Sequence, residues 1–338
     1  MSGAVRRRAL GLLGWSLLAV VAAAFVWVNR HDVPAAIRQL LRADRRWVTA
    51  AAVVALVSFA NHTAQFAAGL RAADAPLPIR QLGRAAASAF FLNTITKSNG
   101  LAGLLSFLRA GRRTGGSRQR ITAGYLLVTL LGHLALVLVV VVAMGLLVAD
   151  GRVTGVELVA LAGFVIYTVA QAAILIAVVG RRRWLDRLFA VVGSVRARLR
   201  PERAPRAAGS GAEDLREAIK TVRSRPRAVV VTGLLSLAVD GLNIVLLVCA
   251  LRAVGFHGSV TVAFTAYAVS VLFMVVSFLP GGLGVVEAGM AATLVASGVT
   301  AATAAAAVVI YRLFELWVPG LVGAACTGSA LRGGGDAA

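Results

Sequence analysis

The sequence predicts an all-α integral membrane protein, a polytopic helical bundle with about six spanning helices, two re-entrant helical hairpins and a possible inverted repeat. Three observations support this fold class. The 338 residues are 59% hydrophobic and only 14% charged, which leaves too little polar surface for a soluble protein of this size. Several apolar runs reach the roughly 20 residues needed to span a hydrocarbon core about 30 Å thick. Two of these runs are interrupted, one by polar residues and one by a Pro-Gly stretch.

The candidate helices follow one another along the chain as nine apolar segments. These are 10–28, 47–70, 85–108, 121–149, 157–179, 228–250, 260–279, 285–298 and 300–327. The first follows three arginines and is longer than the apolar core of a signal peptide, so we interpret it as a retained transmembrane helix. Residues 34–46 combine apolar and basic side chains at helical spacing and are expected to lie flat at the membrane interface. We expect one transmembrane domain over 1–330, with a cytoplasmic basic loop at 180–227, and a disordered tail at 331–338.

The positions of the basic residues predict the topology. If every segment crossed the membrane, the basic loops 109–120 and 180–227 would both lie outside, against the positive-inside rule. If 85–108 instead forms a hairpin that enters and leaves on the cytoplasmic side, the inside segments hold 26 of the 35 basic residues and the outside loops hold seven. The half-helix 85–92 agrees, because its length of about 12 Å reaches only the middle of a bilayer. Both termini are then cytoplasmic.

A second interruption lies at Pro280–Gly284. The segment that follows, 285–298, rises only about 21 Å and is too short to cross without tilting. Together with 260–279 it is expected to form a hairpin that enters from the outside. One hairpin from each side, at corresponding places in the two halves, is typical of an inverted repeat with a binding site near the bilayer midplane.

Charged residues at membrane depth are the candidates for function, because such charges are rare and usually face a cavity or pair with each other. They are Lys97, Asp240, Glu287, Arg312 and Glu315. Lys97 is one of only two lysines and lies in the polar stretch 93–100, which we interpret as the floor of a cavity. Arg312 and Glu315 share a helix face and can pair, whereas Glu287 begins a half-helix, where the helix dipole favours a carboxylate. The alternative is a structural role, as buried ion pairs and caps.

The sequence disfavours several other functions. The net charge of +21 comes from basic loops beside apolar segments, and no aromatic-interleaved basic face suggests nucleic-acid binding. The two cysteines lie in apolar segments and form neither a disulfide framework nor a zinc site. The four histidines lack ligand spacing, and no Ser/His/Asp set can be assembled. We therefore expect no metal, no cofactor and no enzymatic activity.

Two stretches resemble a known family. They are FFLNTITKSNGLAGLLSFLRAGRR and FLPGGLGVVEAGM, the latter followed by VIYRLFELWVPGLVG. Both are similar to the lysylphosphatidylglycerol synthase transmembrane-region family, also called flippase-like domain proteins, over about 10–327. The resemblance implies a bundle with re-entrant helices and, from the best-understood relatives, translocation of an aminoacylated phospholipid between leaflets. Those relatives carry a cytosolic synthase domain after the membrane part. This chain stops at 338, so we expect it not to make aminoacyl lipids.

The resemblance and the charge placement together give the predicted site. The expected substrate-binding residues are Asn93, Lys97, Ser98, Asn99, Gly100, Gly103, Pro280, Gly281, Gly282, Gly284, Glu287 and Arg312, and Asp240 and Glu315 are expected to balance charge. At Asn99 the family commonly has glycine. We expect Lys97 and Arg312 to meet the phosphate of the substrate.

The predicted function is that of a flippase in a bacterial inner membrane, moving an anionic or zwitterionic phospholipid or a lipid-linked envelope precursor. Two alternatives remain open. One is a non-transporting partner or regulator of an envelope-lipid enzyme, docking through the 180–227 loop. The other is an intramembrane transferase acting on lipid-linked substrates. Partners are thus a lipid and the membrane, with a homo-oligomer or an envelope enzyme as further possibilities and no nucleic acid.

Overall fold

The computed structural model describes residues 33–96, 100–149, 161–170, 208–277 and 279–332. Every regular element within these ranges is a helix, which confirms the all-helical membrane class. Several predicted features lie outside the described residues. These are the first helix at 10–28, most of 157–179, the loop residues 180–207, the tail beyond 332, and Lys97, Ser98 and Asn99.

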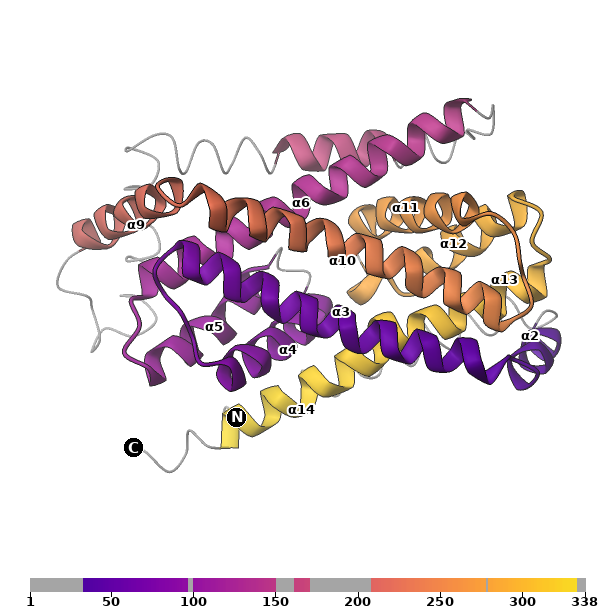
Figure 1. The fold of residues 1–338 in the computed structure, drawn as a ribbon, viewed down its shortest axis with the longest axis horizontal. Helices are drawn as coiled ribbons and strands as arrows, with labels where there is room; N and C mark the ends of the chain where they lie inside the picture. Colours follow the sequence, from indigo (N-terminus) through magenta and orange to yellow (C-terminus); the bar gives the residue numbers. More distant parts are fainter. Residues whose placement is uncertain (1–32, 97–99, 150–160, 171–207, 278, 333–338) are drawn as a thin grey trace, which may run out of the picture.

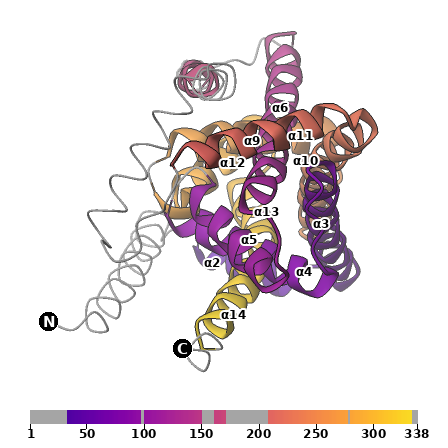
Figure 2. The ribbon, with the colours of Figure 1, turned by 90° about the vertical axis from the view of Figure 1, so that its left-hand side faces the viewer.

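Four continuous helical stretches are long and apolar enough to cross a membrane. They are α3 (Arg45–Ala72), α6 (Arg118–Ala149), α10 (Pro226–Ala253) and a run made of α13 (Ala301–Arg312), the π-helix η3 (Leu313–Trp317) and α14 (Val318–Arg332). The 28 residues of α3 rise about 42 Å. α10 packs along α3, and both helices contact α6 (Figure 1). The end-on view in Figure 2 shows α13 near the centre of the bundle, with α3 and α6 toward its margin.

Small residues bring α3 and α6 close together. A Cβ atom at Gly69 would collide with the side chain of Val128, and one at Gly124 would lie 2.8 Å from the Gly69 carbonyl oxygen. Helices in lipid gain no hydrophobic free energy from associating, so close backbone packing of this kind supplies much of their attraction.

Two helical hairpins lie between the long helices. α4 (Ile79–Thr96) and α5 (Leu101–Arg113) form the first, and α11 (Val260–Val276) and α12 (Val285–Ala296) form the second. The two arms of each hairpin pack against each other, and all four are shorter than the long helices. The largest apolar core lies around the second hairpin, where Leu247, Leu272 and Met290 are fully buried.

The hairpins open toward opposite ends of the bundle. At one end, the Asp74 carboxylate accepts hydrogen bonds from Arg120 at 2.7 Å and from Arg225 at 3.3 Å, which brings the end of α3 to the starts of α6 and α10. α4 starts five residues after Asp74. At the other end, the Asp44 N–H donates to the Ala253 carbonyl at 2.8 Å, and α11 starts seven residues after Ala253. Figure 1 accordingly shows the two hairpins in opposite halves of the bundle.

Two further short helices, α2 and α9, lie at these ends, and the described residues also include a short apolar helix over Leu161–Ala170. α2 (Val33–Leu41) lies where α3 begins, and its helical structure agrees with the amphipathic helix predicted over 34–46. α9 (Ala208–Arg223) packs on α6 at the opposite end through Leu215, Ala218 and Val222.

The first hairpin is longer than the sequence predicted. We expected apolar arms bounded by 85 and 108, but α4 begins at Ile79 and α5 continues to Arg113. The predicted bounds were the ends of the apolar segment, whereas each helix has one more helical turn, rich in arginine, at the open end of the hairpin. Long arginine side chains let a helix extend beyond the apolar layer, because the charged group reaches water while the stem covers apolar surface.

Candidate functional site

The turn of the second hairpin depends on glycine. Pro280–Gly282 forms a single 3-10 turn, and Gly281, Gly282 and Gly284 have φ values of 62°, 68° and 81°. These values fall in the left-handed region, which residues with a Cβ atom rarely adopt. The chain therefore reverses direction sharply, and α12 begins at Val285 directly after the turn.

Arg312 ties this turn to the last long helical run. Its Nε donates to Glu287 Oε1 at 2.6 Å, and its Nη1 donates to Glu315 Oε2 at 2.8 Å. Its Nη2 donates to the carbonyl oxygen of Gly281 at 2.7 Å. Arg312 is 3% exposed, so the guanidinium is held by α12, η3 and the Pro280–Gly282 turn in a nearly dry environment.

The cluster of Arg312, Glu287 and Glu315 has more negative than positive groups. Two carboxylates share one guanidinium, and both carboxylate side chains are themselves mostly buried, with 12% and 18% exposure. The second oxygen of Glu287, Oε2, is buried and accepts no hydrogen bond from any described residue. A buried acceptor without a donor costs about 1–3 kcal/mol. The cluster thus has an unsatisfied group at the turn.

A π-helix positions Glu315. η3 follows Arg312 directly and interrupts the α-helical run between α13 and α14. π-helical turns are rare and often mark functional sites, because the wider turn changes the direction of the side chains that follow. The sequence spacing predicted the Arg312–Glu315 pair, and the structure contains it, but the pair belongs to a π-helical turn and not to a regular α-helix.

The turn of the first hairpin is held by a polar network. The Asn93 side chain accepts a hydrogen bond from the Gly103 N–H at 2.7 Å and donates to the Tyr125 hydroxyl at 3.2 Å. Tyr125 in turn donates to the Gly100 carbonyl at 2.8 Å. Gly100 has φ of 88°, and a Cβ atom at Gly103 would lie 2.5 Å from both the Asn93 amide nitrogen and the Tyr125 hydroxyl. The structure therefore gives Asn93, Gly100 and Gly103 a common role in shaping this turn.

The two turns meet in the middle of the bundle. A Cβ atom at Gly281 would lie 3.2 Å from the Thr94 methyl group and 3.4 Å from Leu316, so the second turn lies against the end of α4. α14 also packs along α4, where Gly323 lets it approach the Ala87 carbonyl closely. The structure brings together most of the predicted residues of both turns. Thr94 is also close in sequence to Lys97, which the structure does not describe.

Asp240 lies on another helix and has a different partner. The Tyr267 hydroxyl donates to Asp240 Oδ1 at 2.6 Å, which joins α10 to α11. Asp240 is 5% exposed and forms no ion pair within the described part of the chain. The sequence analysis missed Tyr267 and Tyr125, because one tyrosine in an apolar helix carries no signal for its long-range partner.

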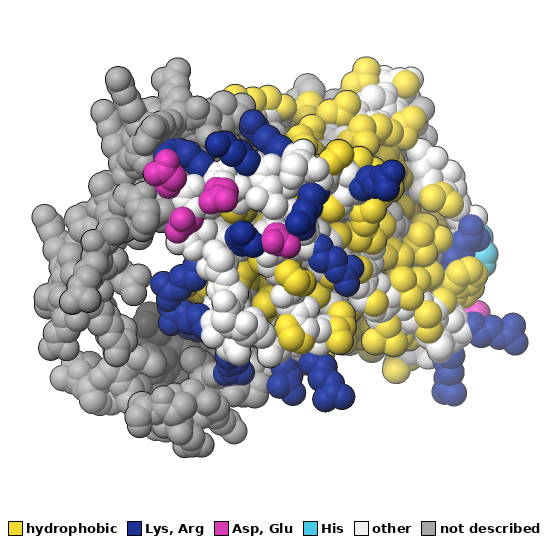
Figure 3. Space-filling model, turned by 60° about the vertical axis from the view of Figure 1, so that its left-hand side comes forward, with side chains coloured by type: hydrophobic (Ala, Val, Ile, Leu, Met, Phe, Trp, Pro, Cys, Tyr) yellow, Lys and Arg dark blue, Asp and Glu magenta, His cyan; other side chains and the backbone are white. Residues whose placement is uncertain are grey.

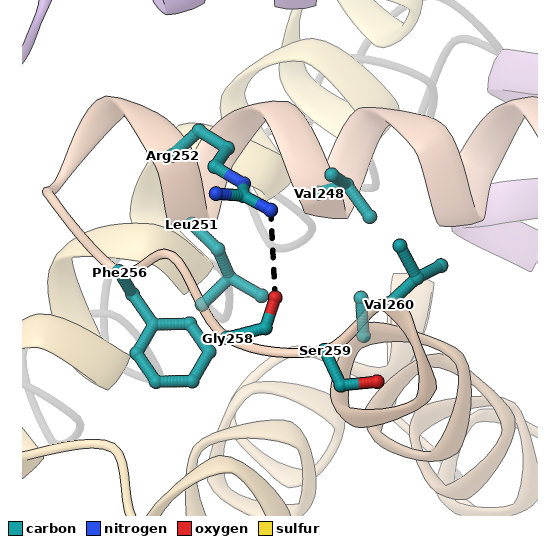
Figure 4. Close-up of a pocket in the computed structure, with 8 residues that line it drawn as sticks. Val248, Leu251, Arg252, Phe256, Gly258, Ser259 and Val260 are labelled. Carbon is teal, nitrogen blue, oxygen red and sulfur yellow. Dashed lines mark hydrogen bonds between the residues drawn. The ribbon is translucent and has the colours of Figure 1, made fainter.

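The remaining features of the structure offer no competing site. Within the described ranges no three His, Cys, Asp or Glu side chains are grouped as a metal site would require. A small hollow lies between the end of α10 and the start of α11, where Arg252 reaches the Gly258 carbonyl at 3.5 Å (Figure 4). Most of its lining is apolar, and it contains none of the predicted site residues. The meeting point of the two hairpins is therefore the candidate site.

Comparison with known proteins identifies the family of the chain. The model of the family described as "Lysylphosphatidylglycerol synthase TM region" matches residues 14–323, nearly the whole chain. The chain therefore belongs to this family and is a multi-pass membrane protein. No curated protein matches the sequence.

Proposed function

Since the chain belongs to the lysylphosphatidylglycerol synthase transmembrane-region family, we propose that it moves a phospholipid or a lipid-linked envelope precursor across a bacterial inner membrane. The substrate has an anionic or zwitterionic head group and leaves chemically unchanged. The hairpin α4–α5 opens to the cytoplasm and α11–α12 to the outside, which gives each leaflet access to one hairpin.

One observation carries this proposal. Two hairpins that open at opposite ends of the bundle meet turn to turn, at a buried cluster of one arginine and two glutamates. Buried charges within a membrane domain are costly unless they are paired or used. Buried charged groups between two hairpins that open at opposite ends are the kind of arrangement that alternating-access transporters use.

The cluster suggests how a lipid head group replaces Glu287 and Glu315 as the partner of Arg312. In the structure Glu287 and Glu315 both bind Arg312, so the guanidinium already has anionic partners inside the protein. A lipid phosphate competes with these carboxylates for the guanidinium, since arginine binds phosphate and carboxylate in the same bidentate manner. Loss of the Arg312 bond to the Gly281 carbonyl then frees the turn of the second hairpin. Lys97, beside the first turn, supplies a second positive charge for the phosphate.

The test uses the two lysines of the chain as a matched pair. Purified protein is reconstituted into vesicles with fluorescent phosphatidylglycerol in both leaflets, and a membrane-impermeant quencher reports how fast inner-leaflet lipid reaches the outside. We expect wild type and Lys220→Ala to move lipid equally, because Lys220 lies on α9 away from both turns. We expect Lys97→Ala to reduce the rate at least tenfold. Equal rates for the two lysine variants would contradict the proposed role of Lys97.

The same vesicles test the absence of chemistry. We expect the mass spectrum of the extracted lipids to be identical before and after incubation with the protein. A new lipid product that requires the protein would instead support the transferase alternative.

A further inference from the structure

The outer face of α5 carries exposed leucines and exposed arginines. Leu101, Leu105, Arg109 and Arg112 are all exposed and lie within one face of the helix, since their spacing of four, four and three residues returns to the same side. The opposite side of α5 is buried, with Gly103, Ser106, Phe107 and Gly111 packed inward. Leu101 and Leu105 are 65% and 51% exposed, so no element among the described residues covers this face.

The order of side chains along this face is apolar first and basic second. Leu101 lies next to the turn in the middle of the bundle, and Arg112 lies about 16 Å away at the open end of the hairpin. A phospholipid in a bilayer has the same order, with acyl chains near the midplane and phosphate at the surface.

Arginines from α4 extend the basic part. The bond between the Gly103 N–H and Asn93 fixes the register of the antiparallel arms. Arg84 lies nine residues before Asn93 on α4, and Arg112 lies nine residues after Gly103 on α5. The two arginines are therefore at the same height along the hairpin axis. The exposed arginines at this end of the hairpin are Arg80, Arg84, Arg109, Arg112 and Arg113.

These five arginines lack acidic partners. None of them forms an ion pair with a described residue, in contrast to Arg120 and Arg225, which both bind Asp74. The reason is visible in the sequence, because no Asp or Glu occurs between Asp74 and Asp150. Figure 3 shows Lys and Arg side chains gathered at this end of the molecule beside a continuous hydrophobic surface. These exposed arginines are therefore available to an anionic partner.

We propose that the outer face of α5, with Arg84 of α4, is a binding track for an anionic phospholipid, whose phosphate contacts Arg84, Arg109 and Arg112 and whose acyl chain lies along Leu101 and Leu105. The inference deepens the proposed function, because the track leads from the cytoplasmic leaflet to the turn that contains Lys97. A phospholipid can contact the leucines with its acyl chain and the arginines with its phosphate at the same time. A soluble anion satisfies only the arginines, and a second copy of this chain would place like charges opposite one another.

The experiment uses the full chain in phosphatidylcholine vesicles with a trace of phosphatidylglycerol that carries a photoreactive group in its acyl chain. After illumination, digestion and mass spectrometry locate the label. We expect labelling of the peptide that contains Leu101 and Leu105, and competition by unlabelled phosphatidylglycerol but not by phosphatidylcholine. Labelling distributed evenly over all exposed helices would overturn the track.

Three triple variants measure the role of the arginines. Each arginine near an anionic head group is worth about a fivefold change in affinity, so Arg84→Gln, Arg109→Gln and Arg112→Gln together should reduce labelling roughly 100-fold. The matched control replaces Arg42, Arg45 and Arg46, which are exposed at the opposite end of the bundle, and should leave labelling unchanged. Lysine at the same three α4–α5 positions should restore most of it, because the charge is retained. An equal effect of both glutamine triples would show that only overall charge matters and would refute the site.

The readouts separate this inference from the proposed function. Labelling of α5 in a wild-type protein that moves no lipid would refute the flippase and retain the track. Normal lipid movement without labelling of α5 would refute the track alone. If the label is absent and a Leu105→Cys variant forms a disulfide-linked dimer on oxidation, this face is an interface between copies and the lipid track is wrong.

Discussion

Replacing Arg312 by leucine perturbs the buried cluster most directly. The substitution removes three hydrogen bonds, of 2.6, 2.8 and 2.7 Å, to Glu287, Glu315 and the Gly281 carbonyl. It leaves two carboxylates side by side in a site where the arginine was only 3% exposed. Removing one member of a buried ion pair costs about 3–5 kcal/mol, because the remaining charge has neither water nor a counter-ion. We therefore expect Arg312→Leu to lower the free energy of unfolding by about 3–5 kcal/mol.

The assay is equilibrium unfolding in mixed micelles with increasing SDS, followed by circular dichroism. Arg225→Leu is the matched control, because its ion pair with Asp74 is 43% and 48% exposed and such pairs contribute only about 0–1 kcal/mol. A second variant adds Glu287→Gln and Glu315→Gln to Arg312→Leu, and should recover most of the loss because no buried charge remains. If Arg312→Leu costs no more than Arg225→Leu, or if neutralising both glutamates recovers nothing, the electrostatic reasoning is refuted.

Three further predictions concern the two turns. Gly103→Ala should destabilise the protein by about 1–3 kcal/mol in the same unfolding assay, because the added Cβ would lie 2.5 Å from the neighbouring asparagine and tyrosine side chains; Gly83→Ala, with open space around its Cβ, should be neutral or slightly stabilising. Tyr125→Phe should cost about 1–3 kcal/mol through two lost hydrogen bonds, and unchanged stability would remove this hydroxyl from the network. Gly281→Ala, at φ of 62°, should slow lipid movement in the vesicle assay, whereas Gly233→Ala, whose added Cβ meets no neighbour, should not. Equal rates for the two variants would show that the conformation of this turn does not affect transport.

The long helices were predictable from the sequence because burial in lipid depends on a property of each segment alone. A run of about 20 apolar residues identifies a spanning helix wherever its neighbours lie. The segments predicted at 47–70, 121–149 and 228–250 correspond to α3, α6 and α10 with shifts of only a few residues. The breaks predicted at 93–100 and 280–284 were also local features, since polar residues and glycines mark places where a membrane helix often ends. The first break is shorter than predicted, because α4 continues to Thr96.

Long-range contacts were not predictable in this way. The sequence indicated that Arg312 and Glu315 are neighbours, because i and i+3 positions share a helix face. It carried no information on the bond from Arg312 to Glu287, 25 residues away, or on the contact between Gly281 and Thr94. Asn93 was predicted as a substrate-binding residue from the family resemblance and the polar stretch, and its hydrogen bonds to Gly103 and Tyr125 could not be predicted from the sequence.

The sequence by itself determined that this chain is a helical membrane protein with two interrupted segments and a strongly basic end, because hydropathy and charge are properties of the residues and their order. Only the tertiary structure decided that the two interruptions meet and which carboxylates share Arg312. The reason is physical: pairing of buried polar groups depends on which helices pack together, and helix packing is set by shape complementarity that no single segment encodes.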